Sequence, residues 1–200
     1  MQNILLDRPP ETVCIGGTEY PIKTDFRAGV AFELAVQQGE KRLFELLRIW
    51  YGDNIPMDID GATDAALRFY RCGTEKDTAE EEKPATGQRK PEKQAYSFEV
   101  DADAIVSSFW MAYGIDLSTA SLHWWLFRHL LFGLPEDTEF QKRVYIRTVD
   151  TKDMSRKQKQ SIERQRKRLA IKHGSNMTLE ERNRRMVDYV NKRMSEATKG

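Results

Sequence analysis

Apolar and polar positions alternate briefly near the start of the chain and then recur at helical spacing over most of its length. Two short runs of β-favouring residues, 12–15 and 18–22, are joined by Gly16 and Gly17. Two consecutive glycines suit a tight turn that needs positive φ. The pattern therefore predicts one small β-hairpin, followed by helices.

Three amphipathic helices are predicted before residue 74. The first begins at Thr24 or Asp25 and ends at Gly39, and its expected apolar face comprises Phe26, Val30, Ala31 and Leu34. In the second, apolar residues recur up to Gly52: Leu43, Leu46, Leu47 and Trp50. The third covers about 61–72 and ends at Gly73, and its inward residues are Ala65, Ala66, Phe69 and Tyr70.

Three more helices are predicted between residues 101 and 147. The helix at 101–113 carries two adjoining apolar stripes, Ile105–Phe109–Ala112 and Val106–Trp110–Tyr113, so we expect it to be largely buried. The next helix is expected to be capped by Ser118 or Ser121 and is apolar around most of its circumference, which predicts a position at the centre of the fold. A shorter helix should run from Asp137 or Thr138 towards Arg147.

Composition divides the chain into four parts. Residues 1–73 hold the hairpin and the first helices, 74–94 form a charged linker that we expect to be mobile, 95–149 complete the helical core, and 150–200 form a basic helical extension. The predicted fold class is therefore mainly α, with a small N-terminal hairpin and a helical, basic C-terminal extension.

The extension contains two predicted helices of different character. The first, at 153–173, has a thin apolar stripe and a basic cluster made of Arg164, Arg166, Lys167 and Arg168. The second follows the capping box that begins at Thr178, and its apolar face consists of Leu179, Met186, Val187, Val190 and Met194. We interpret this second face as a surface for binding a partner protein, and packing of these residues within the chain itself is the alternative.

Charge and cysteine usage exclude several classes of protein. The sequence is 40% hydrophobic and 32% charged, its net charge is +1, and Cys14 and Cys72 lie far apart, so neither a disulfide framework nor a zinc knuckle is indicated. The N-terminus lacks the features of a signal peptide, and the strongest apolar run, 124–132, is too short to span a bilayer. We therefore expect no membrane insertion.

No motif for catalysis, cofactor binding or metal binding is recognisable. His123 and His129 do not share the i, i+4 spacing of zinc sites, and we expect both to be hydrogen-bonded at the edge of the core. The acidic residues near Asp58 and those at Asp101 and Asp103 do not fit the EF-hand pattern. Asp101 and Asp103 are better explained as residues at the start of a helix. The sequence thus predicts a binding protein and not an enzyme.

Seven segments carry a resemblance to a known family. They are NILLDRPPETV at 3–13, YPIKTDFR at 20–27, FYRCG at 69–73, FEVDAD at 98–103, YGIDL at 113–117, LHWWLFR at 122–128 and GLPEDT at 133–138. In this order they resemble the bacteriophage gene-product-fifteen family of tailed phages and prophages, over most of residues 1–150. The resemblance implies a tail-assembly chaperone in the host cytoplasm, whose partner is the tape-measure protein, with other tail-assembly proteins as further candidates. It implies no catalytic residues.

Two other functions stay open beside the chaperone. The protein could be a structural component retained in the virion. It could also be an accessory protein that binds nucleic acid through the basic cluster. Nucleic acid is disfavoured, because no aromatic residue lies between Lys152 and Lys172 to stack on bases. Association into a homo-oligomer is also open.

Overall fold

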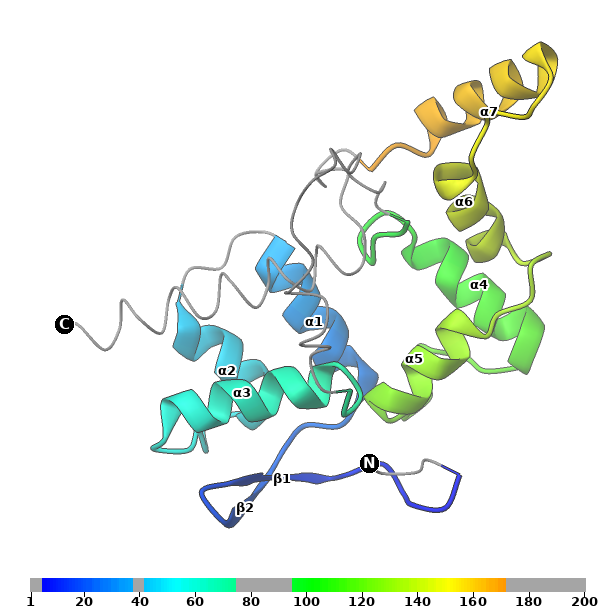
Figure 1. Cartoon of the computed structure of the whole chain (residues 1–200). Helices are drawn as coiled ribbons and strands as arrows, with labels where there is room; N and C mark the ends of the chain where they lie inside the picture. The colour runs from blue at the N-terminus through cyan, green and yellow to red at the C-terminus, as the bar shows by residue number, and fades with distance from the viewer. Residues whose placement is uncertain (1–4, 38–41, 75–94, 172–200) are drawn as a thin grey trace. The chain divides into compact units, whose positions relative to one another are not determined.

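The N-terminal hairpin forms at the two glycines, as predicted. The computed structural model describes residues 5–37, 42–74 and 95–171. Strands β1 (Thr12–Ile15) and β2 (Thr18–Pro21) pair antiparallel, with Thr12 opposite Pro21 and Ile15 opposite Thr18 (Figure 1). Gly16 and Gly17 both have positive φ, 56° and 82°, which is the conformation that a two-residue hairpin turn requires.

In the part of the chain that the structure describes, seven helices follow the hairpin (Figure 1). They are α1 (Phe26–Gln37), α2 (Leu43–Tyr51), α3 (Ile59–Tyr70), α4 (Ala102–Tyr113), α5 (Trp124–Phe132), α6 (Glu139–Thr148) and α7 (Arg156–Arg168). The predicted fold class, mainly helical with a small hairpin, is confirmed. Local capping explains most of the boundaries: Thr138 accepts from the Gln141 N–H, and Gly114 ends α4 in a left-handed conformation.

Two compact units make up the described chain. Unit 1 comprises residues 5–37, 42–74 and 121–129, and unit 2 comprises 95–120 and 130–171. The core of unit 1 is strongly aromatic. Its buried large side chains include Phe26, Phe32, Trp50, Phe69, Tyr70, Trp124, Trp125 and Phe127.

The first residues of α5 join unit 1 through their indole groups. The Trp124 Nε1–H donates to the Tyr70 carbonyl at 2.9 Å, and the Trp125 Nε1–H donates to the Phe69 carbonyl at 2.8 Å. The two indoles thus bond to carbonyls at the C-terminal end of α3, where the regular hydrogen bonds of the helix end; the Phe69 carbonyl also accepts the Cys72 N–H, and the Tyr70 carbonyl also accepts from Arg128. α5 starts at Trp124 without the predicted serine caps, because the His123 Nδ1 accepts the Trp125 N–H instead.

The buried face of α1 differs from the predicted one. Phe32 and Glu33 are buried, whereas Val30 and Leu34 are only half-buried and Ala31 is exposed. The Glu33 carboxylate lies inside the unit because it accepts a hydrogen bond from the Tyr70 hydroxyl at 2.8 Å. Apolar spacing alone could not reveal a buried carboxylate with a partner on another helix.

Unit 2 contains α4, α6, α7 and the last residues of α5. α4 packs against α6, and α6 packs against α7. The buried apolar residues of this unit are Tyr96, Phe98, Ala104, Ile105, Phe109, Leu117, Leu131, Leu134 and Phe140. The Phe140 N–H donates to the Ser108 hydroxyl at 3.1 Å, which fixes the start of α6 against the middle of α4.

Several predictions concern residues outside the described ranges: the end of the first helix at Gly39, the linker at 75–94, and the helix after Thr178. Among the described residues, no helix is long and apolar enough to cross a membrane.

Candidate protein-binding surface

One face of α4 is apolar and exposed. Ile105 and Phe109 are buried as predicted, but the exposed fractions of Val106, Trp110 and Met111 are 46%, 60% and 76%. The prediction that α4 is largely buried was therefore wrong for one of its two stripes. We call these three residues the α4 patch.

The α4 patch lies in a shallow hollow. The other residues that line it are Ala102, Asp103, Ser107, Ile115 and Asp116. Asp116 accepts hydrogen bonds from the Ser118 hydroxyl and N–H, which lower the pKa of its carboxyl. The Arg143 guanidinium likewise lowers the pKa of Asp103. Asp116 therefore places a negative charge at one end of the hollow at neutral pH, whereas the charge of Asp103 at the other end is paired with Arg143.

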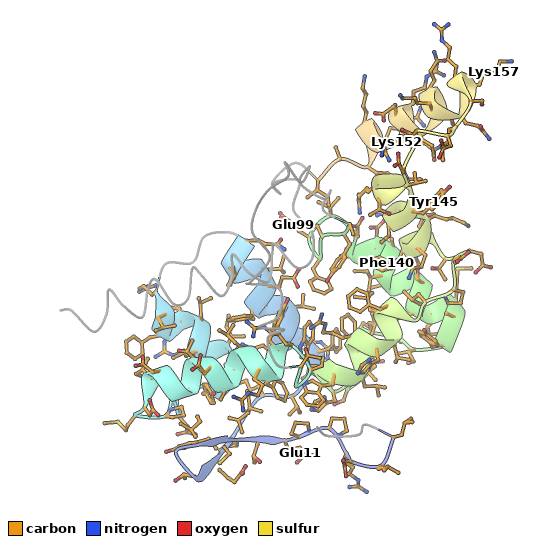
Figure 2. The ribbon with its side chains drawn as sticks, viewed as in Figure 1. Glu11, Glu99, Phe140, Tyr145, Lys152 and Lys157 are labelled. Atoms are coloured by element: carbon orange, nitrogen blue, oxygen red, sulfur yellow. The ribbon has the colours of Figure 1, made fainter. Side chains whose placement is uncertain are left out.

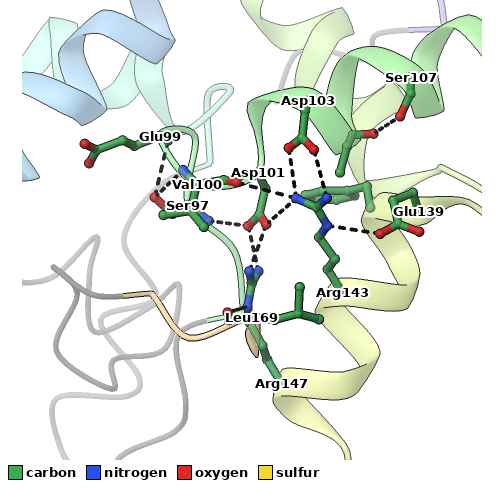
Figure 3. A network of polar contacts seen from close by, with 12 residues as sticks. Ser97, Glu99, Val100, Asp101, Asp103, Ser107, Glu139, Arg143, Arg147 and Leu169 are labelled. Carbon is green, nitrogen blue, oxygen red and sulfur yellow. Dashed lines mark hydrogen bonds and ion pairs between the residues drawn. The ribbon is translucent and has the colours of Figure 1, made fainter. Parts of the chain in front are cut away.

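A buried ion pair fixes the start of α4. The Arg147 guanidinium on α6 donates to both carboxylate oxygens of Asp101, at 2.6 and 2.8 Å, and the Ser97 N–H donates to the same carboxylate at 3.0 Å (Figure 3). Arg147 also donates to the carbonyls of Ala95 and Leu169, at 3.2 and 2.9 Å. A single arginine therefore holds three separated segments of unit 2 together.

Arg143, one turn earlier on α6, extends this network to the surface. Its guanidinium donates to both carboxylate oxygens of Asp103 at 2.9 Å and to Glu139 at 3.2 Å (Figure 3). It also lies 3.4 Å from the Asp101 carboxylate. The hydrogen bond to Asp103 is the main cause that raises the pKa of Arg143. These contacts hold the end of the α4 patch that carries Asp103 in a fixed position.

Asp101 occupies the N-cap position of α4, as predicted for a residue at the start of this helix. Its side chain makes no capping hydrogen bond and is instead the buried partner of Arg147. Asp103 does lie in the first turn, as expected of a helix-start residue. Asp101 and Arg147 are 46 positions apart, and no local pattern in the sequence pairs them.

The basic cluster divides into one structural arginine and three exposed cations. Arg166 donates to the carbonyls of Ile146, at 2.8 Å, and Val149, and it also pairs with Glu163. These bonds attach α7 to α6, so Arg166 is engaged within unit 2, and the predicted role of the basic cluster stays a prediction. The exposed members are Arg164, Lys167 and Arg168. Lys152 and Lys157, near the start of α7, are exposed as well (Figure 2).

The predicted partner-binding residues lie outside the described ranges: Leu179, Met186, Val187, Val190 and Met194. They stay a prediction. The signal that could have found the α4 patch was present in the sequence, since apolar residues cover more of α4 than one neighbouring helix can bury. The two adjoining stripes led instead to the expectation of a largely buried helix.

The histidines differ in their surroundings. His123 is hydrogen-bonded as predicted, because its Nε2 lies 3.0 Å from the Pro10 carbonyl and its Nδ1 accepts the Trp125 N–H at 3.1 Å. Burial lowers the pKa of His123. His129 is exposed, contrary to the prediction. Among residues 5–37, 42–74 and 95–171, no three His, Cys, Asp or Glu side chains gather in a way that could hold a metal ion.

Comparison with known proteins gives one finding. A model of the family described as bacteriophage Gp15 protein matches residues 5–171. No curated protein and no solved structure matches the chain. The matched range contains six of the seven segments that carry the resemblance, and residues 5–13 of the first segment. It also contains the α4 patch and α7.

Proposed function

The chain belongs to the bacteriophage Gp15 protein family and is a phage protein, and from this we propose that it is a tail-assembly chaperone that binds the tape-measure protein. It acts by binding, in the host cell, while the tail is being built. Its role is to cover apolar helical surface on the tape-measure protein until the tail tube does so.

The α4 patch is the observation that carries this proposal. Val106 and Trp110 are one turn apart on the same stripe, and Met111 lies on the adjoining side of the helix, and all three side chains are exposed and line the same hollow. Trp and Met are common in protein interfaces because they offer a large or adaptable apolar contact. Such an apolar hollow suits an amphipathic helix laid along it.

The charge at one end of the patch refines the expected partner. Asp116 lines the hollow beside the apolar side chains and stays ionised at neutral pH. A partner helix with a basic residue beside its apolar face would complement Asp116, and opposite charges at the rim of an interface mainly raise the association rate. The proposal thus names an amphipathic helix with a basic residue next to its apolar face as the bound segment.

Co-expression tests the proposal directly. The wild-type chain should raise the soluble yield of the tape-measure protein encoded by the same phage, and the double variant Trp110→Ser/Met111→Ser should lose most of this effect. Met57→Ser is the matched control, because Met57 is 96% exposed in unit 1 and lies outside the α4 patch. If the double variant solubilised the tape-measure protein as well as Met57→Ser does, the α4 patch would not be the binding surface.

Mass spectrometry of purified virions separates a chaperone from a structural tail component. A chaperone should be absent from finished particles, and many copies per virion would favour the structural alternative. The basic cluster provides the test for nucleic acid. A gel shift that weakens steeply with salt and disappears in Arg164→Gln/Lys167→Gln/Arg168→Gln would favour that function instead.

A further inference from the structure

The two edges of the N-terminal hairpin are not equivalent. The Ile22 N–H donates to the Glu11 carbonyl at 3.1 Å, so these two residues form a hydrogen-bonded pair next to the strands. Antiparallel pairs alternate between hydrogen-bonded and non-hydrogen-bonded positions. With the observed register, the backbone groups of Thr12 and Cys14 therefore point away from β2. Within the described residues, these groups bond to no other backbone segment.

β2 has a proline at the equivalent place on its own outer edge. Pro21 lies opposite Thr12 in a non-hydrogen-bonded pair, so its nitrogen is on the edge that faces away from β1. Proline has no N–H to offer to a further strand and commonly protects exposed edges. The edge of β1 lacks this protection, and it is the one that can accept another strand.

A groove follows the open edge of β1. Its residues are Pro10, Thr12, Val13, Cys14, Ala65, Arg68, Phe69, Cys72, Gly73, Thr74, Trp125 and His129, and its volume is about 440 Å³. Three consecutive residues of β1 line it, as expected if the groove runs beside the strand and not over one of its faces. The opposite wall is the C-terminal half of α3, and the walls are mostly apolar.

The groove is lined by basic side chains and by no acidic ones among the described residues. Arg68 on α3 and His129 on α5 are exposed and line it, and among the described residues no Asp or Glu does. Glu11 precedes the strand (Figure 2), and Glu19 on β2 accepts a hydrogen bond from the hydroxyl of Thr12 at 2.5 Å. Arg68 forms no ion pair with a described residue, so its guanidinium can bind a carboxylate from another molecule.

We propose that the β1 groove binds an extended segment of a partner protein, which adds to β1 as a third strand. The segment has apolar side chains at alternate positions, which fill the space between β1 and α3, and one carboxylate that pairs with Arg68. The backbone N–H and C=O groups of Thr12 and Cys14 supply the main-chain hydrogen bonds. The β1 groove is a different surface from the α4 patch. Strand addition at the groove does not depend on which protein binds to the α4 patch.

A defined peptide tests strand addition. The probe is an acetylated and amidated six-residue peptide of alternating valine and threonine with one central valine replaced by glutamate, so that the carboxylate points to the same face as the other valines. It should bind the full-length chain, slow the hydrogen exchange of the Thr12 and Cys14 amides, and protect the Cys14 thiol from a thiol reagent. Arg68→Glu should weaken its binding roughly tenfold, because a hydrogen bond to a charged group contributes that much. A lysine-containing version should bind Arg68→Glu better than the wild type.

Two controls distinguish strand addition from side-chain binding. Cys14→Pro removes an edge N–H that β2 does not use, so the hairpin should keep its pairing while peptide binding is lost, and Cys14→Ser should bind normally. A peptide methylated on its backbone nitrogens should not bind the wild type, which gives a test that needs no variant to fold.

Three results would overturn the proposal. They are no binding at millimolar peptide, equal binding of the methylated peptide, and a concentration-dependent dimer that Cys14→Pro dissociates. The last would show that a second copy of the chain occupies the edge of β1.

Discussion

Unit 1 buries its three tryptophans, whereas unit 2 leaves its single tryptophan, Trp110, largely exposed. In unit 1 the indoles of Trp124 and Trp125 bond to backbone carbonyls at the end of α3, so large neutral side chains both fill the core and satisfy its polar groups. In unit 2 charged groups do the second task, through Asp101 and Arg147. The contrast indicates that unit 2 does not need the Trp110 indole for its core, which leaves it free for binding.

Arg147→Ala should have the largest effect on stability. The substitution leaves the buried Asp101 carboxylate without its partner and frees the carbonyls of Ala95 and Leu169. Breaking a buried ion pair in this way costs about 3–5 kcal/mol in the free energy of unfolding. Urea denaturation followed by circular dichroism measures it.

The double variant Asp101→Leu/Arg147→Met is the control for that substitution. It removes both charges, so it should recover a large part of the lost stability. If Arg147→Ala cost less than about 1 kcal/mol, the ion pair would not be the element that holds unit 2 together.

Gly29→Ala should have the next largest effect, this time in the aromatic core of unit 1. A Cβ at Gly29 would lie 2.3 Å from a ring carbon of Trp124, so the indole must move away from α1. Overpacking of this kind costs about 1–3 kcal/mol. Thermal melts should show the loss, and Ala31→Ser, at an exposed position of the same helix, should stay within about 0.5 kcal/mol of the wild type.

A melting temperature for Gly29→Ala equal to that of the wild type would mean that the Trp124 ring has room to move. The close packing claimed for unit 1 would then be wrong.

Local signals made most of the fold predictable. The glycine pair of the hairpin, the caps at Thr138 and Gly114, and the helical spacing in α2 each lie within a few residues of the feature they specify. The sequence could not show what each helix face packs against. Periodicity shows that Val106 and Trp110 share a stripe, but it does not show whether the protein itself or another molecule covers that stripe.

The polar core shows the same limit. Glu33 is not among the apolar residues predicted to face inward from α1, yet it is buried, and its partner Tyr70 is 37 positions away. Arg166 looked like one more exposed cation, but it binds carbonyls at the end of α6. Such pairs depend on tertiary contacts, and one sequence without a fold does not identify them.

The pH dependence of stability gives a smaller effect that is confined to unit 1. Burial lowers the pKa of His123 below its usual value of about 6.5, while the Pro10 carbonyl and Glu11 oppose this shift. The unfolded chain therefore takes up the proton first as the pH falls. The contribution of His123 is fully present above about pH 6.5 and decreases below it, because a proton on Nδ1 ends its hydrogen bond with the Trp125 N–H.

Urea titrations at pH 7.5 and pH 5.5 measure this contribution. The difference between the two pH values should shrink in His123→Asn, because asparagine can accept the same N–H and does not titrate in this range. An unchanged difference in the variant would assign the pH dependence to other groups.

Trp110→Ser should have the smallest effect on stability, although it removes a large aromatic side chain. The indole is 60% exposed on α4, so its truncation should change the free energy of unfolding by less than about 0.5 kcal/mol. Phe109→Ala, at the neighbouring position, should cost about 3–5 kcal/mol, because that ring is fully buried. Urea denaturation of both variants in parallel compares the two faces of one helix. If Trp110→Ser cost 2 kcal/mol or more, the indole would serve the core of unit 2 as Trp124 serves that of unit 1, and the α4 patch would lose its physical basis as a binding surface.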